Sequence, residues 1–95
     1  MSSITDLNDA EQWLDFKHKL SLDSPDFFES LRKKHPQLKP REVKVCALLF
    51  SDCSTKEIGN KLGMQDHAVD VMRSRLRDKF SLDKDEVLSE YLKTI

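Results

Sequence analysis

Residues 54–80 read STKEIGNKLGMQDHAVDVMRSRLRDKF, and this stretch decides the fold class. Ser54 followed by Glu57 fits the S-x-x-E capping box that opens a helix. Gly63 is suited to close that helix, because glycine adopts the left-handed conformation without steric cost. Gly59 lies inside the helix, where glycine costs about 1 kcal/mol relative to alanine, so we expect the following helix to cross closely there. The stretch therefore begins with a short helix and a tight turn.

A longer helix follows the turn, beginning at Gln65 or Asp66 and continuing to Phe80. Apolar residues recur along it at helical spacing, namely Val69, Met72, Leu76 and Phe80. The opposite side carries His67, Val71, Ser74 and Asp78, flanked by Asp70, Arg75 and Arg77, with Arg73 nearer the edge of the core. A short helix, a turn containing glycine and a longer basic helix together predict a helix-turn-helix.

The residues before this unit predict further helices. Asn8 with Glu11 is a capping box that opens a helix continuing to Leu20. Ser24 caps a second helix with Pro25 at its first position, and that helix ends before His35-Pro36. Four aromatic residues of these helices are expected in the core or at a seam with a neighbouring domain: Trp13, Phe16, Phe27 and Phe28.

A third helix runs from Pro40 to Phe50 and is almost wholly apolar beyond Lys44, so we expect it at the centre. Asp83 with Glu86 caps the last helix, Lys84 to Ile95, whose apolar stripe is Val87, Leu88, Tyr91, Leu92 and Ile95. The fold class is therefore all-α, a four-helix unit containing the helix-turn-helix, preceded by one or two additional helices.

Composition excludes several classes of protein. The 95 residues are enough for one domain. No apolar run approaches the roughly 20 residues of a membrane helix, and no secretory signal is visible, so we expect a cytoplasmic protein without a membrane anchor. Two cysteines are too few for a disulfide framework, and two glycines are few for an all-β domain.

Charge is unevenly distributed along the chain, although the net charge is only -1. Residues 1–31 hold two cationic and seven acidic side chains, whereas residues 32–50 hold six cationic and one acidic. A basic region within a neutral chain attracts polyanions, and it is also compatible with an ordinary solvated surface.

The segments Pro40-Arg41-Glu42-Val43, Ser54-Thr55-Lys56-Glu57-Ile58-Gly59, Leu62-Gly63-Met64 and Arg73-Ser74-Arg75-Leu76-Arg77 resemble the LuxR/FixJ-type DNA-binding domain of bacteria. The resemblance covers residues 38 to about 93. Residues 25–36 also resemble the variant that ends large bacterial sensor-regulators, so an upstream sensor domain is one implied partner. The chain then divides into a helical extension, residues 1–37, and a LuxR-type domain, residues 38–95.

What the resemblance implies is sequence-specific binding of double-stranded DNA for transcription regulation, with residues 66–80 as recognition helix. It also implies a homodimer through the C-terminal helix, residues 84–95, which could equally pack on the central helix. The chain departs from the family pattern at four places: Lys39, Gln65, Ala68-Val69-Asp70 and Met72. Asp70 could accept a hydrogen bond from cytosine or pair with Arg73 or Ser74.

The predicted DNA-binding residues fall into two groups. Phosphate contacts are expected from Ser54, Thr55, Lys56, Arg77 and Lys79. Base or groove contacts are expected from His67, Asp70, Val71, Ser74 and Arg75. The basic residues 32–34 would extend the phosphate track.

Nothing in the sequence indicates an enzyme or a cofactor, since it has no phosphate-binding glycine loop and no nucleophile motif. Cys46 is expected to be a small core residue, and the spacing of Cys46, Cys53 and the three histidines does not suit a metal. Two alternatives to DNA-dependent regulation stay open. One is a helix-turn-helix module that binds a protein instead of DNA, and the other is a sigma-like domain that contacts promoters only with RNA polymerase.

Overall fold

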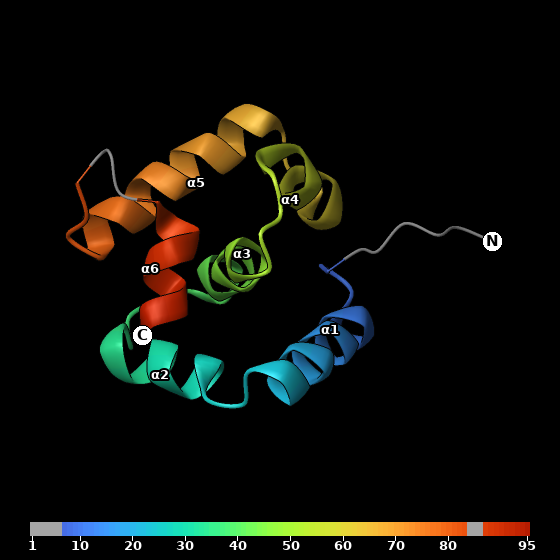
Figure 1. Ribbon diagram of the computed structural model, residues 1–95. Helices are drawn as coiled ribbons and strands as arrows, with labels where there is room; N and C mark the ends of the chain where they lie inside the picture. The colour runs from blue at the N-terminus through green and yellow to red at the C-terminus, as the bar shows by residue number, and fades with distance from the viewer. Residues whose placement is uncertain (1–6, 84–86) are drawn as a thin grey trace.

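The computed structural model describes residues 7–83 and 87–95, and these residues form six helices and no strand (Figure 1). The predicted all-α class is confirmed. The helices are α1 (Ala10–Asp23), α2 (Phe27–Lys34), α3 (Pro40–Phe50), α4 (Thr55–Leu62), α5 (Asp66–Lys79) and α6 (Leu88–Thr94).

Helix α3 lies at the centre, with α4 and α5 on one side and α1 and α2 on the other (Figure 1). All five residues 45–49 are buried. Helix α6 packs along α3, and α4 contacts both α3 and α5. The prediction that the apolar segment from Pro40 is central is confirmed, and its burial supplies the main hydrophobic stabilisation of the fold.

Helix α1 begins one residue later than the capping box at Asn8 predicts. Asp9 is the N-cap, and its carboxylate accepts from the backbone N–H groups of Glu11 at 2.9 Å and Gln12 at 3.1 Å. The side-chain amide of Asn8 instead donates to the carbonyl oxygen of Leu62 at 2.7 Å. Asn8 therefore ties the segment before α1 to the end of α4.

Helix α2 begins at Phe27, so the prediction that Ser24 caps it with Pro25 at the first position is wrong. Ser24 ends α1, because its backbone N–H donates to the carbonyl of Leu20 at 2.8 Å. Pro25 lies in the turn between the helices, and Asp26 is the N-cap of α2.

The four aromatic residues of α1 and α2 form a series of ring contacts that runs from α1 through α2 to α3. Phe27 is buried and stacks on Phe50 of α3 with ring centroids 4.2 Å apart. Trp13, Phe16 and Phe28 are half-buried, and Trp13 meets Phe28 edge to face at 6.0 Å. No residue of α1 is fully buried. This helix therefore contacts the core through partly buried side chains, among them its aromatic residues.

Helix α6 begins at Leu88, later than predicted. The predicted cap residue Glu86 and the first residues of the predicted range, 84–86, lie outside the described part of the chain. Val87 is extended and 47% exposed, so it does not belong to the apolar stripe of the helix. Leu88 and Leu92 are buried against α3, as the packing interpretation of this helix predicts.

The turn between α4 and α5 follows the predicted chemistry closely. Gly63 closes α4 with φ 66°, in the left-handed region that favours glycine. Another segment of backbone also approaches Gly59 closely, as expected. That segment is not the following helix, which the sequence predicts. A Cβ at Gly59 would stand 2.5 Å from the carbonyl oxygen of Met64, which belongs to the turn rather than to the following helix.

We expect Gly59→Ala to destabilise the chain by about 1–2 kcal/mol, although alanine is the better helix former. Overpacking costs about 1–3 kcal/mol, and a Cβ only 2.5 Å from a backbone oxygen belongs to the upper part of that range, about 2–3 kcal/mol. The gain in helix propensity returns about 1 kcal/mol. Asn60→Ala, one residue along on the exposed side of α4, is the matched control and should not destabilise. Urea unfolding measures the free energy of unfolding of both variants. A Gly59→Ala chain as stable as the original chain would contradict the close approach.

Candidate nucleic-acid interface

The outer face of α5 carries all five residues predicted to contact bases or the groove. His67, Asp70, Val71, Ser74 and Arg75 are exposed, with Val71 at 36%. Val69, Leu76 and Phe80 on the inner side are buried, and Met72 is half-buried. The expected division of α5 into a core side and an outer side is confirmed. The exposed valine is the one branched apolar side chain on this outer face.

The start of α4 is capped as predicted. The Ser54 hydroxyl accepts from the backbone N–H of Glu57 at 3.2 Å, and the Glu57 carboxylate accepts from the backbone N–H of Ser54 at 3.0 Å. Both of these N–H groups are therefore engaged within the cap, and the phosphate contacts expected at Ser54, Thr55 and Lys56 stay a prediction. The Lys56 side chain next to the cap is exposed.

A hydrogen bond joins α4 to α5 beside this cap. The Arg73 guanidinium donates from Nη1 to the Thr55 hydroxyl at 2.7 Å. The Nε of Arg73 is buried without a hydrogen-bond partner among the described residues. Thr55 therefore orients α5, a role for which the sequence pattern carries no signal because the two residues are 18 positions apart.

Lys79, one of the predicted phosphate contacts, has a partner inside the fold. Its ammonium donates to both carboxylate oxygens of Glu42, at 2.8 Å and 2.7 Å. Glu42 is only 6% exposed, and its Oε1 also accepts from the backbone N–H of Lys39 at 2.8 Å. Glu42 thus replaces the side-chain cap missing at Lys39 and anchors the end of α5 to the start of α3.

The charge of Glu42 is stabilised by these two contacts. Burial by itself raises the pKa of the Glu42 carboxyl, but the Lys39 backbone N–H and the Lys79 ammonium outweigh it and leave the pKa below its ordinary value. Arg77, the neighbouring predicted phosphate contact, is half-buried, and its Nε is buried without a partner among the described residues. Lys56 and Arg75 are therefore the more accessible cations of the predicted set.

Acidic and basic side chains share the outer face of α5. Asp66, Asp70 and Asp78 are exposed there beside Arg75. The pairing of Asp70 with Arg73 or Ser74 is not found among the described residues, since Arg73 is bonded to Thr55. The carboxylate of Asp70 thus remains turned to solvent.

The basic residues 32–34 end α2, and this end of α2 lies near the end of α5. The ring of His35, the C-cap of α2, is 4.2 Å from that of Phe80, the C-cap of α5. Lys33 is also paired with Glu29 at 3.1 Å on the surface of α2. The extension of the phosphate track to these residues stays a prediction.

Cys46 lies in the core, as predicted. It is fully buried, and burial raises the pKa of its thiol to about 12, with a further contribution from the Glu42 charge. A thiol in this state is not available as a thiolate ligand or nucleophile. Within the described residues, no group of three or more histidine, cysteine or acidic side chains is arranged to hold a metal.

We expect Glu42→Gln to lower the free energy of unfolding by about 1–3 kcal/mol near pH 7, the range for losing a hydrogen-bonded charge. Because the folded pKa of Glu42 is lowered, its contribution is complete above about pH 5 and is lost as the pH falls below about 4. The difference between the two proteins should therefore shrink on acidification. Glu90→Gln, an exposed change of the same kind, is the control for urea unfolding at each pH. A difference that is constant from neutral to acid pH would contradict the assignment.

Comparisons of the chain with protein-family models, with curated proteins and with solved structures found no match. Among the described helices, none is both long and apolar enough to cross a lipid bilayer.

Proposed function

We propose that this chain binds double-stranded DNA in a sequence-dependent manner and acts as the output domain of a LuxR/FixJ-type transcription regulator. In this proposal α4, the Gly63 turn and α5 form a helix-turn-helix. The observation that carries it is the outer face of α5, which presents His67, Val71, Ser74 and Arg75 to solvent on a helix packed against α4.

The dimensions of α5 suit a DNA groove. It has 14 residues, which corresponds to about 21 Å at 1.5 Å per residue, and the major groove of B-DNA admits a helix of this kind. The Thr55–Arg73 bond and the Gly59 contact hold α4 and α5 together, so that α5 would enter the groove as part of a rigid pair. Such preorganisation reduces the ordering cost of binding.

The side chains of this face can read bases through complementary chemistry. Arg75 can donate two hydrogen bonds to a guanine edge, and the methyl groups of Val71 can contact a thymine methyl. Asp70 can accept from the amino group of cytosine and would disfavour other bases at that position. Lys56 at the start of α4 would bind a backbone phosphate and fix the orientation of α5.

A dimer through the C-terminal helix also remains a proposal. Leu88 and Leu92 are already used against α3, and the Tyr91 hydroxyl is within 2.8 Å of His35 Nε2. The exposed side chains of α6 are Glu90, Lys93 and Thr94, with Val87 just before the helix. A contact through α6 would therefore be mainly polar and is expected to form only on DNA.

The competing function is a protein-interaction module with the same fold. Two observations favour it, namely the solvent-exposed carboxylate of Asp70 and the engagement of Lys79 by Glu42. Both lower the attraction of the α5 face for phosphate. Salt dependence separates the two functions, because phosphate contacts release counterions and apolar protein contacts do not.

Fluorescence anisotropy with a labelled pool of random duplexes tests the proposal. Lys56→Ala should weaken binding on every sequence and make the salt slope shallower by about 1. Arg75→Ala should weaken binding to duplexes selected from the pool by about 1–3 kcal/mol and affect the unselected pool less.

Lys19→Ala is the matched control, because this lysine lies on α1 and pairs with Asp15 on the same helix. It should bind as the original chain does. Absence of binding at low salt and at protein concentrations above about 100 μM would reject DNA binding and leave the protein-interaction module.

A further inference from the structure

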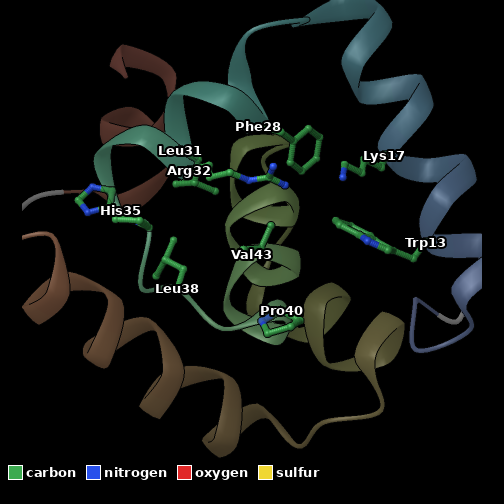
Figure 2. Close-up of a pocket in the computed structure, with 10 residues that line it drawn as sticks. Trp13, Lys17, Phe28, Leu31, Arg32, His35, Leu38, Pro40 and Val43 are labelled. Carbon is green, nitrogen blue, oxygen red and sulfur yellow. The ribbon is translucent and has the colours of Figure 1, made fainter.

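A pocket of about 300 Å³ lies between α1, α2 and the start of α3 (Figure 2). Most of its wall is apolar. Trp13 and Phe28 form one side, and Leu31, Leu38 and Val43 form the base. The volume is at the lower end of the range for small-molecule sites in proteins.

Two cations point into the mouth of this pocket from opposite helices. Figure 2 shows the ammonium of Lys17 on α1 and the guanidinium of Arg32 on α2 directed toward the space beside Trp13 and Phe28. The Lys17 nitrogen stands 5.3 Å from the centre of the Phe28 ring. Lys44, which does not line the pocket, stands 5.6 Å from the centre of the Trp13 ring.

Among the described residues, no acidic side chain lines the pocket, and one acid on each of the two neighbouring helices pairs with a lysine outside it. Asp15 on α1 pairs with Lys19 at 3.1 Å, and Glu29 on α2 pairs with Lys33 at 3.1 Å. Neither Lys17 nor Arg32 has a carboxylate partner among the described residues. Each helix thus has one lysine neutralised outside the pocket and one cation without a carboxylate partner lining the pocket, Lys17 on α1 and Arg32 on α2.

His35 closes the far end of the pocket as a neutral group. Its Nε2 lies 2.8 Å from the Tyr91 hydroxyl, and its ring is 4.2 Å from that of Phe80. Burial, with the nearby Lys34 charge, lowers the pKa of its imidazole. The positive charge of the pocket is therefore carried by Lys17 and Arg32 at its mouth, and its interior is uncharged.

We propose that this pocket binds a small aromatic carboxylate. The flat ring would lie between Trp13 and the apolar base, where aromatic faces and edges offer favourable contacts. The carboxylate would remain at the mouth between Lys17 and Arg32, which suits the planar, bidentate geometry of a guanidinium. This site is separate from the proposed DNA-binding face and does not depend on that proposal.

Isothermal titration calorimetry of the full chain with 2-naphthoate tests the site, with 2-naphthamide as the uncharged probe of the same shape. We expect 2-naphthoate to bind with a Kd below about 1 mM, as ligand efficiency allows for a probe of this size. The amide should bind about tenfold more weakly, because exposed charge pairs contribute up to about fivefold each. The indole N–H signal of Trp13, the one tryptophan of the chain, should shift in an NMR titration with 2-naphthoate.

Lys17→Gln/Arg32→Gln should reduce the affinity for 2-naphthoate to that for the amide. Lys19→Gln/Lys33→Gln removes the same charge from the same two helices outside the pocket and should leave the affinity unchanged. Equal affinity of the original chain for the acid and the amide would overturn the proposal without any variant. An unshifted Trp13 signal at saturation, or an equal loss in both double variants, would also overturn it.

Discussion

Residues 45–49 of α3 are buried on every side of the helix, so the fold must place neighbours all around it. Helices α4 and α6 pack directly on it, and α1 and α2 cover the remaining side through their aromatic residues. Helix α5 is held mainly through α4 and through its buried inner residues. Because α5 is the outermost helix on its side, the same hydrophobic constraint that buries α3 leaves the outer face of α5 in solvent.

Hydrophobic burial is non-directional, so it does not fix the orientation of α5 relative to α3 and α4. A few polar contacts fix that orientation. The Thr55–Arg73 bond joins its middle to the start of α4, and the Glu42–Lys79 pair joins its end to the start of α3. Both cations lie in the stretch that predicts a nucleic-acid surface. Some of the basic character of α5 therefore serves the fold, and the exposed charge left for a ligand is smaller than the count of basic residues indicates.

The helix caps and the turn can be predicted from neighbouring residues in the sequence. Contacts between residues far apart in the sequence cannot be predicted in this way. The Ser54–Glu57 capping box and the left-handed Gly63 follow from residues within one or two turns, and the structure confirms both. Asn8 and Asp9 are adjacent residues that both suit an N-cap, so local chemistry could not choose between them. Glu42 and Lys79 are 37 positions apart, and no periodicity connects them. The pocket beside Trp13 arises only when α1 and α2 come together, so it has no signature in either helix alone.

The proposed DNA binding requires that the outer face of α5 be the surface that meets the duplex. The most direct measurement is an NMR titration of the ¹⁵N-labelled chain with a short duplex selected for binding. If α5 meets DNA, the backbone amide shifts should concentrate at its exposed residues, from His67 to Arg75, and at the start of α4 around Lys56. Shifts confined to α1 and α2, or an unchanged spectrum at saturating duplex, would contradict it.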